Sequence, residues 1–198
     1  TNKWGEKIEI NSLQAMLSKK KYSHVAVVHH ETTTGRLNEL AKISELCASY
    51  GAKLLVDTVS SFGAEAIPFE NGTIAACAAT ANKCLHGVPG TSFVLLSRPL
   101  FKDTMPPRRS VYLDLFKYLK TQDAKGTPFT QSVQSFYALE EALKEFFDQG
   151  GRISRYDIYK HRMAKVSETL NFLGIQPFLP SNVNSVVLRS FLLPAGKT

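Results

Sequence analysis

The sequence of 198 residues has few cysteines, a single tryptophan and no long apolar run. Cys47, Cys77 and Cys84 form no CxxC pair, so neither a disulfide framework nor a thiolate zinc site is predicted. No stretch reaches the roughly 18 consecutive apolar residues that a membrane-spanning helix needs, and we expect no membrane partner. Unpaired cysteines in apolar surroundings are typical of a reducing compartment, which predicts a cytoplasmic protein.

Several motifs with known chemistry are also missing. The sequence contains no GxSxG elbow and no GxGxxG fingerprint. Residues 29–31 begin like a helical zinc motif, but Thr34 stands where the second histidine is due, so no metal site is expected. Residues 196–198 resemble the end of a phosphate loop, yet Phe191 occupies the position of its first glycine. The sequence therefore predicts neither a metal centre nor a phosphate loop.

Acidic residues are in the minority, with 17 against 24 lysines and arginines and a net charge of +7. Such an excess favours anionic ligands or nucleic acid in general. The basic residues are scattered, however, apart from residues 19–21 and 108–109, and no aromatic recognition motif accompanies them. We therefore predict solvated charged faces and no nucleic-acid partner.

Short apolar runs alternate with an amphipathic pattern in the first half of the chain. Residues 24–29 and 53–56 have the length and composition of buried strands, and residues 38–50 between them carry apolar side chains at helical spacing. This order is a βαβ unit with parallel strands. Residues 74–79 and 91–96 predict two further strands. The fold class expected is α/β, a mostly parallel sheet with helices on both faces.

The second half predicts two long helices. Thr127-Pro128 has the N-cap and first-turn residues of a helix that continues to Gly150. The next helix carries an apolar stripe spaced four and three residues apart, which we expect to be buried core: Tyr159, Met163, Val166, Leu170 and Leu173. Residues 184–193 resemble a strand. We predict a large domain in residues 1–150, incomplete at its N-terminus, and the incomplete start of a small α+β domain in residues 151–198.

Chemically useful side chains follow three of the predicted strands. Asp57 ends one strand, Lys83 follows another, and the segment HETTTG of residues 30–35 follows a third. In open α/β sheets, ligands bind at the carboxyl ends of the strands. An amine, a carboxylate and several hydroxyls are therefore expected to meet in one crevice.

Pyridoxal phosphate would use all of these groups. Its aldehyde needs an amine to form a Schiff base, its ring nitrogen needs a carboxylate to stay protonated, and its phosphate suits hydroxyls at a helix N-terminus. Each residue also has an ordinary interpretation, because Asp57 is a common turn former and a lysine such as Lys83 usually lies on the surface. Taken together, the groups favour a cofactor site.

Three segments, VVHHETTTGRLN, LLVDTVSSFGAEAIPF and ATANKCLHGVPGTSFVLLSR, closely resemble class V, fold-type I pyridoxal-phosphate aminotransferases. The resemblance extends over nearly the whole chain, and ANKCxxGVPG is its most specific part. It implies the large domain of that fold, pyridoxal 5'-phosphate as cofactor, and an amino donor and a 2-oxo acid acceptor as substrates.

The resemblance also implies roles for individual residues. Lys83 is implied to be the catalytic lysine that forms the Schiff base, and Asp57 the partner of the pyridine nitrogen. Thr32 is similar to the hydroxyl residue that contacts the ring oxygen, and Val59 would lie against the ring face.

Three further positions are implied to lie near the cofactor phosphate. Asn82 stands immediately before the lysine, on the phosphate side. Thr127 or Thr130 resembles a hydroxyl that the family supplies from the neighbouring subunit, which implies a homodimer.

The resemblance implies transfer of the amino group of 2-aminoethylphosphonate to pyruvate, giving phosphonoacetaldehyde and alanine. Alanine:glyoxylate or serine:pyruvate transfer stays open, and so does a non-catalytic fragment or degenerate paralogue. His30 departs from the pattern, since a cysteine is expected there. The family's N-terminal Gly/Ser-rich turn and C-terminal substrate-binding arginine would fall outside these residues, so we expect the chain to be cut from a longer, complete enzyme.

Overall fold

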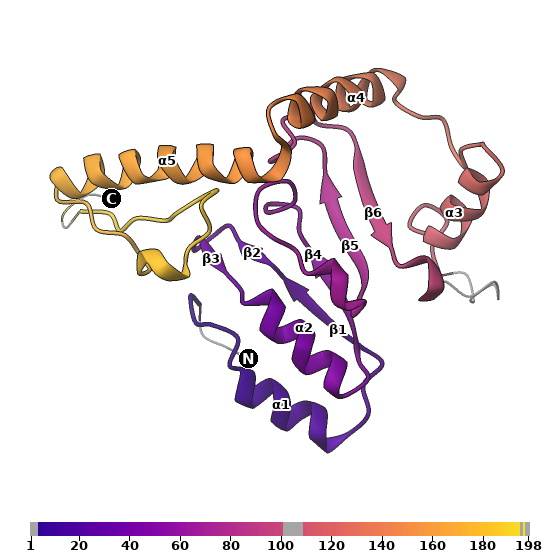
Figure 1. Cartoon of the computed structure of the whole chain (residues 1–198), viewed down its shortest axis with the longest axis horizontal. Helices are drawn as coiled ribbons and strands as arrows, with labels where there is room; N and C mark the ends of the chain where they lie inside the picture. Colours follow the sequence, from indigo (N-terminus) through magenta and orange to yellow (C-terminus); the bar gives the residue numbers. More distant parts are fainter. Residues whose placement is uncertain (1–3, 101–108, 195, 197–198) are drawn as a thin grey trace.

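A four-stranded sheet forms the centre of the computed structural model, which describes residues 4–100, 109–194 and 196 (Figure 1). The strands are β1 (His24–Val28), β4 (Lys53–Asp57), β5 (Ile74–Thr80) and β6 (Ser92–Leu96), and they lie side by side in that order. β1, β4 and β5 are parallel, whereas β6 runs antiparallel to β5. The prediction of a mostly parallel α/β sheet is confirmed.

Two helices cover one face of this sheet. α1 (Ile10–Lys19) and α2 (Leu40–Ser49) pack on each other, and α2 packs on β4 (Figure 1). The helix α2 buries Leu40, Ile43 and Cys47, which recur at helical spacing and so share one side. The core that results is a single cluster, which contains Leu17, Val27, Leu40, Ile43, Cys47, Ala52, Leu54, Val56, Ile74 and Cys77.

The opposite face of the sheet is open in the part of the chain that the structure describes. Side chains alternate between the two faces of a strand, so Leu55 and Asp57 point away from the core that contains Leu54 and Val56. Leu55 is 39% exposed, and its β1 neighbour Ala26 is also exposed. The Asp57 carboxylate is therefore accessible to a ligand at the end of β4.

A small hairpin lies beyond the end of β1. Its strands β2 (His30–Glu31) and β3 (Arg36–Leu37) are antiparallel, and His30 pairs with Leu37. Three short 3-10 helices complete the connections, at Phe69–Asn71, Arg98–Leu100 and Ser181–Val183.

The first long helix begins later than predicted. After α3 (Leu115–Asp123), the helix α4 spans Val133–Asp148, and Thr127-Pro128 lies in the irregular connection before it. The Phe129 ring packs 5.3 Å from the Tyr112 ring and 5.9 Å from the Tyr118 ring, measured between centroids. These tertiary contacts hold the segment away from the helical path that its local capping residues favour.

The second long helix, α5 (Gly151–Phe172), is confirmed, but its apolar stripe is not core. Val166 is 47% exposed and Leu173, just after the helix, is 63% exposed, while Arg155 is its buried residue. Figure 1 shows the reason: α5 contacts α4 near its own start and then extends away from the sheet.

The predicted strand in residues 184–193 is wrong. The described part of this segment forms two isolated bridges, between Arg36 and Asn184 and between Pro177 and Phe191, and no continuous strand. Its backbone is held instead by scattered hydrogen bonds, such as that from Ser185 N–H to Gly35 O. The division into domains at residue 150 stays a prediction.

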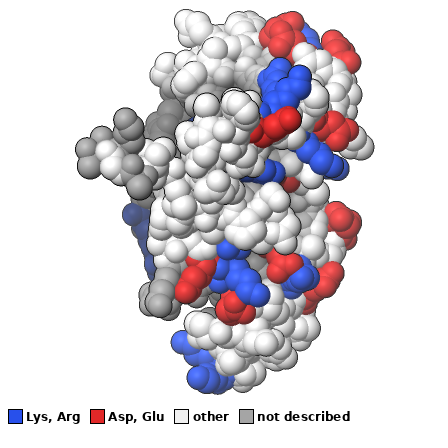
Figure 2. Space-filling model, turned by 90° about the vertical axis from the view of Figure 1, so that its left-hand side faces the viewer, with Lys and Arg blue, Asp and Glu red and all other residues white. Residues whose placement is uncertain are grey.

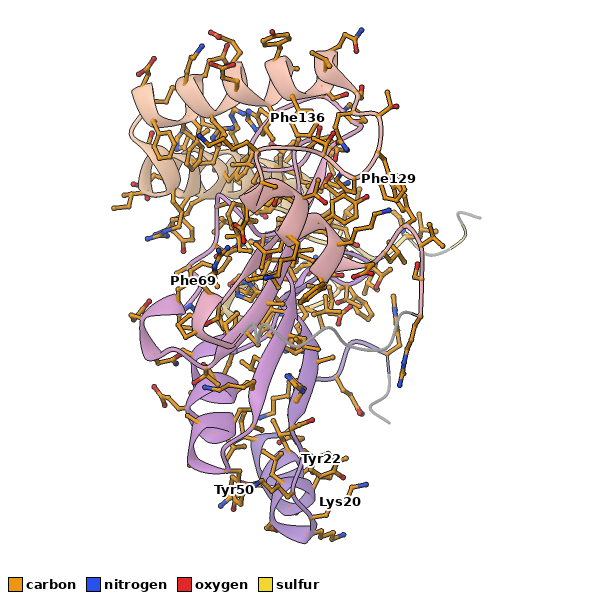
Figure 3. The ribbon with its side chains drawn as sticks, turned by 90° about the vertical axis from the view of Figure 1, so that its right-hand side faces the viewer. Lys20, Tyr22, Tyr50, Phe69, Phe129 and Phe136 are labelled. Atoms are coloured by element: carbon orange, nitrogen blue, oxygen red, sulfur yellow. The ribbon has the colours of Figure 1, made fainter. Side chains whose placement is uncertain are left out.

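The surface has no single charge sign. Figure 2 shows lysine and arginine interspersed with aspartate and glutamate over the face in view. Aromatic side chains lie at both ends of the molecule in Figure 3, with Phe136 on α4 and Phe129 in the connection before it, and with Tyr22 and Tyr50 at the other end. None of the helices that the structure describes is long and apolar enough to cross a bilayer.

Candidate cofactor site

A tight loop after β5 carries Lys83. The N–H of Ala81 donates to Thr91 O over 3.0 Å, and the N–H of Gly87 donates back to Ala81 O over 2.8 Å. Inside this ring, the N–H of His86 donates to Lys83 O over 2.9 Å. A Cβ on Gly87 would stand 3.1 Å from Ala81 Cβ and O, so a glycine is needed for the loop to close this tightly. We call residues 81–87 the lysine loop.

Two buried side chains of the lysine loop, those of Cys84 and Leu85, anchor it to the protein interior. Cys84 is 1% exposed and Leu85 is 2% exposed, whereas Lys83 itself is exposed. Burial raises the pKa of the Cys84 thiol to about 11, so it stays protonated and is no nucleophile at neutral pH. Of these three side chains, that of Lys83 is the one exposed to solvent.

Asp57 lies on the strand next to the one that delivers Lys83. It pairs with Ala78 across β4 and β5, and adjacent strands lie ~4.8 Å apart. Its Oδ1 accepts a hydrogen bond from the N–H of Val59 over 2.9 Å, which orients the carboxylate and keeps half-buried Val59 beside it. The structure thus brings Asp57 and Lys83 to one edge of the sheet, as predicted.

Thr32 reaches the same edge from the first strand. The turn around it is closed by hydrogen bonds from the N–H groups of Thr34 and Gly35 to Glu31 O, and Thr32 is exposed. Asn38 ties the turn to β1, because its Nδ2 donates to Val28 O over 2.8 Å. Thr32 therefore stands at the end of β1 on a well-fixed turn.

Asn82 is held by the strand that precedes it. Its Oδ1 accepts a hydrogen bond from Thr80 Oγ1 over 2.9 Å, and the same hydroxyl is 3.0 Å from Thr91 O. Asn82 is exposed beside Lys83. Its amide nitrogen has no hydrogen-bond partner among the described residues, so it is free to bind an anion.

Within one chain, the structure does not place Thr127 and Thr130 beside the lysine loop. Thr127 and Thr130 are exposed in the α3–α4 connection, at the right-hand edge of Figure 1. Thr127 Oγ1 donates to Phe129 O over 3.0 Å, and no described hydrogen bond joins either threonine to the lysine loop. The helix start that supported their assignment lies at Val133 instead.

Two buried histidines after β1, His29 and His30, form hydrogen bonds to the loop that follows β4. Nδ1 of His29 is 3.0 Å from Ser61 Oγ, and Nδ1 of His30 is 3.2 Å from Ser60 O. Burial, with a smaller effect of His30, lowers the pKa of His29 to about 4, and burial also lowers the pKa of His30. Within the described residues, no three His, Cys, Asp or Glu side chains gather as metal ligands.

Sequence reasoning missed two side chains of α5 that contact the lysine loop. Arg155 Nη1 donates to Cys84 O over 3.2 Å, and Tyr159 Oη lies 2.6 Å from His86 Nε2. The available signal was their separation of four residues, which puts both on one side of a helix. Tyr159 was instead assigned to the core stripe.

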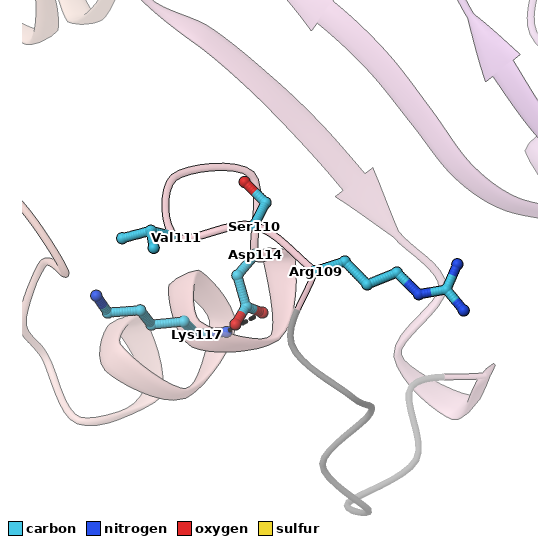
Figure 4. Close-up of a pocket in the computed structure, with 5 residues that line it drawn as sticks. All are labelled: Arg109, Ser110, Val111, Asp114 and Lys117. Carbon is cyan, nitrogen blue, oxygen red and sulfur yellow. Dashed lines mark hydrogen bonds between the residues drawn. The ribbon is translucent and has the colours of Figure 1, made fainter.

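A hollow of about 270 Å³ lies elsewhere, beside α3 (Figure 4). Asp114 and Lys117 line it, but the Asp114 carboxylate already accepts a hydrogen bond from Lys117 N–H as the cap of α3. Arg109 points away from Lys117 in Figure 4. The reactive groups therefore share an open strand edge and not this cavity.

A lysine loop, a carboxylate and a hydroxyl turn lie at the carboxyl edge of a mostly parallel sheet, where ligands bind in open α/β folds. The family model described as aminotransferase class-V matches residues 2–173, and the chain belongs to that family.

The most similar relatives agree on one name. The chain is 35% identical over 192 residues to 2-aminoethylphosphonate--pyruvate transaminase of Aeromonas hydrophila, covering 94% of this chain and 50% of the relative. It is 38% identical over 175 residues to 2-aminoethylphosphonate--pyruvate transaminase 2 of Paraburkholderia xenovorans, covering 88% and 47%. The chain thus spans about half the length of these curated relatives.

Solved structures support the fold. An alanine--glyoxylate aminotransferase from Nostoc sp. superposes with a TM-score of 0.86 at 26% identity, covering 99% of this chain and 53% of that one. A pyridoxamine-pyruvate aminotransferase from Mesorhizobium loti gives the same TM-score at 24% identity, covering 98% and 51%.

Proposed function

We propose that the chain is part of a pyridoxal-phosphate-dependent transaminase that moves the amino group of 2-aminoethylphosphonate to pyruvate, giving phosphonoacetaldehyde and alanine. The observation that carries the proposal is the exposed pair of Asp57 and Lys83 at the ends of adjacent parallel strands. The substrates are proposed from the name shared by relatives at 35% and 38% identity. The reaction belongs to phosphonate degradation.

The residues present fit pyridoxal phosphate. Neither the Lys83 amine nor Asp57 Oδ2 has a hydrogen-bond or ion-pair partner among the described residues, so both are available to a ligand. When bound, the cofactor supplies an electron-accepting ring that stabilises negative charge on the substrate carbon. Asp57 would accept a hydrogen bond from the protonated ring nitrogen and keep that nitrogen charged.

Lys83 has two tasks in this proposal. Its Nζ would be the amine that holds the cofactor aldehyde. When free, the same Nζ would take the proton from the substrate's amino carbon as a general base. Lys83 is exposed at the edge of the sheet, so its side chain has room to move between these two tasks.

The other predicted residues orient the ring and the phosphate. Thr32 would donate its hydroxyl hydrogen to the ring oxygen, and half-buried Val59 would exclude water from one ring face. Asn82 would donate from its amide nitrogen to the phosphate.

Thr127 and Thr130 would complete the phosphate site of a second copy, so we propose a homodimer. This is supported by their exposed positions in the α3–α4 connection, without hydrogen bonds to the lysine loop of their own chain. We also propose a large domain ending at residue 150, where the consecutive glycines 150 and 151 both have positive φ. The free cysteines support a cytoplasmic location.

Alanine:glyoxylate transfer is the second candidate function. It is supported by the fold similarity to the Nostoc enzyme, which is less similar in sequence than the phosphonate relatives. A screen of amino donors separates the two candidates. Turnover with alanine and glyoxylate, but not with 2-aminoethylphosphonate, would contradict the first proposal.

The test of the cofactor site is an absorption spectrum with added pyridoxal phosphate, followed by borohydride reduction and peptide mass mapping. We expect a visible band and the cofactor mass on Lys83. Lys83→Arg should lose both, whereas Lys53→Arg, a control lysine on β4 whose amine donates to Gly72 O, should keep them. Label spread evenly over surface lysines would contradict the assignment. Absence of the visible band in the complete gene product would also contradict it and would favour a degenerate paralogue.

A further inference from the structure

Arg155 is a buried cation without a carboxylate partner in the described part of the chain. It is 3% exposed, and its guanidinium donates from Nη1 to Cys84 O over 3.2 Å and from Nη2 to Gln149 Oε1 over 3.3 Å. Its Cζ lies 5.5 Å from the centroid of the Phe146 ring. Burying a charge without an opposite charge is costly, so stability alone does not explain an arginine at this position.

Tyr159 contacts the other side of the lysine loop. Its hydroxyl lies 2.6 Å from Nε2 of His86, and the two rings meet at 60° with centroids 5.9 Å apart. His86 has a positive φ of 63°, a conformation that a non-glycine residue adopts only when its surroundings hold it there. Burial of Tyr159 raises the pKa of its hydroxyl, so the hydroxyl keeps its proton.

These two contacts come from one rigid support. Arg155 and Tyr159 are four residues apart, so they share one side of α5 one turn apart. They contact two of the three residues that follow Lys83 in the loop, at the carbonyl of Cys84 and at the ring of His86. The start of α5 is itself held by α4, on which it packs.

We propose that Arg155 and Tyr159 are positioning residues that clamp the lysine loop and so fix the direction in which Lys83 leaves the sheet. The inference deepens the proposed function and rests on its assignment of Lys83. Proton transfer depends steeply on the placement of the base, and a loop held at two points keeps the Lys83 amine aligned with the end of β4. The clamp binds backbone and ring atoms of the loop and does not touch the substrate.

The first test measures the loop without any cofactor. Hydrogen exchange of the His86 and Gly87 amides, which donate to Lys83 O and Ala81 O, reports whether the loop opens. Tyr159→Phe removes one hydrogen bond and should speed this exchange severalfold; Arg155→Met removes two and should speed it about tenfold or more. Arg152→Met, at an exposed position of the same helix, is the control and should change nothing.

Arg155→Met leaves the buried carbonyl of Cys84 without its donor and could unfold the chain, so Tyr159→Phe provides an independent readout that keeps the ring packing. Arg155→Lys should restore part of the protection, because a lysine can still donate to Cys84 O. Unchanged exchange in a folded Tyr159→Phe variant would overturn the clamp, whatever the cofactor does.

The second test uses the complete gene product loaded with pyridoxal phosphate. In a single half-reaction, Tyr159→Phe should lower the limiting rate constant severalfold while the donor concentration for half-maximal rate stays within about twofold, since the clamp aligns the base and does not bind substrate. A lower affinity for the donor with an unchanged limiting rate would overturn the positioning role. Failure of the proposed function is seen separately, as absence of the borohydride-fixed label on Lys83 in the unmutated protein.

Discussion

Oε1 of Glu65 accepts a hydrogen bond from Ser185 Oγ over 2.6 Å, and the two residues are 120 positions apart in the sequence. The same oxygen accepts from Val186 N–H over 2.9 Å, and Glu65 is 4% exposed. This carboxylate fastens the irregular C-terminal segment to the loop that follows β4, close to the end of the strand that carries Asp57.

Glu65→Ala should therefore destabilise the chain by about 3 kcal/mol, because it leaves a buried hydroxyl and a buried N–H without their acceptor. Ser185→Ala removes the hydroxyl hydrogen bond but keeps the one from Val186 N–H, so it should cost about 1 kcal/mol. Urea unfolding measures both. Exposed Glu70 provides the control, and Glu70→Ala should stay within ~0.5 kcal/mol of the parent. A Glu65→Ala variant as stable as that control would contradict the account.

Acid should destabilise the fold through His29. Burial lowers the pKa of His29 to about 4 from 6.5, so between these values the unfolded chain binds a proton that the folded chain does not. Stability is then fully present above pH 6.5 and falls as the pH drops, by roughly 2 kcal/mol at pH 5. His30, whose pKa burial also lowers, acts in the same direction.

The measurement is the urea midpoint at pH 7.5, 6 and 5, where the midpoint should fall at each step. His29→Gln should flatten this dependence, and His24→Gln, at an exposed position of β1, should not. A parent midpoint that is equal at pH 7.5 and pH 5 would contradict the assignment.

Gly35 should be intolerant of a side chain for two reasons that can be separated. Its φ is +82°, and a Cβ there would stand 2.8 Å from Asn184 Oδ1 and 2.9 Å from Leu188 O. Gly72 has a similar φ of +64° but nothing within 4 Å of its Cβ position, so Gly72→Ala measures the backbone strain alone, about 1 kcal/mol. Gly35→Ala should cost at least about 1 kcal/mol more, because the C-terminal segment must shift. Equal losses of stability for Gly35→Ala and Gly72→Ala in thermal unfolding would contradict this, because the C-terminal segment would then move aside at no cost.

Asp57→Asn should separate chemistry from folding. The amide oxygen can still accept from Val59 N–H, and the side chain is exposed, so the free energy of unfolding should change by less than ~0.5 kcal/mol. Loss of the charge that stabilises the ring nitrogen should lower kcat of the complete, cofactor-loaded protein by roughly 100-fold or more. Asp157→Asn, exposed on α5, is the matched control. Full activity in Asp57→Asn would remove Asp57 from the proposed mechanism.

The strands and the residues at their ends were predictable from local patterns. β4 spans Lys53–Asp57 and β5 spans Ile74–Thr80, each within a residue of the predicted bounds. Both are short apolar runs bounded by turn-forming residues, a local pattern that is typical of buried strands. Because the carboxyl ends of parallel strands share an edge, the prediction that Asp57 and Lys83 lie at one edge of the sheet came from the same pattern.

The second half was less predictable because its local signals compete with distant contacts. Thr127-Pro128 has good capping chemistry, but the stacking of Phe129 on the aromatic residues near α3 delays the helix to Val133. The stripe of α5 is apolar at the correct spacing, yet the helix extends away from the sheet, so its side chains do not join the sheet core and Val166 is 47% exposed. Arg155, which periodicity ranks as a surface residue, is the one it buries.

The sequence alone determined the α/β class, the positions of the main strands along the chain and the identity of the groups at their ends, because those depend on residue type and on spacing along the chain. Only the tertiary structure decided which side chains support them. Arg155 and Tyr159 meet the lysine loop across more than 70 residues, and Glu65 meets Ser185 across 120. No local pattern encodes such pairs, since their energy comes from burial and from hydrogen-bond partners that exist only once the chain has folded.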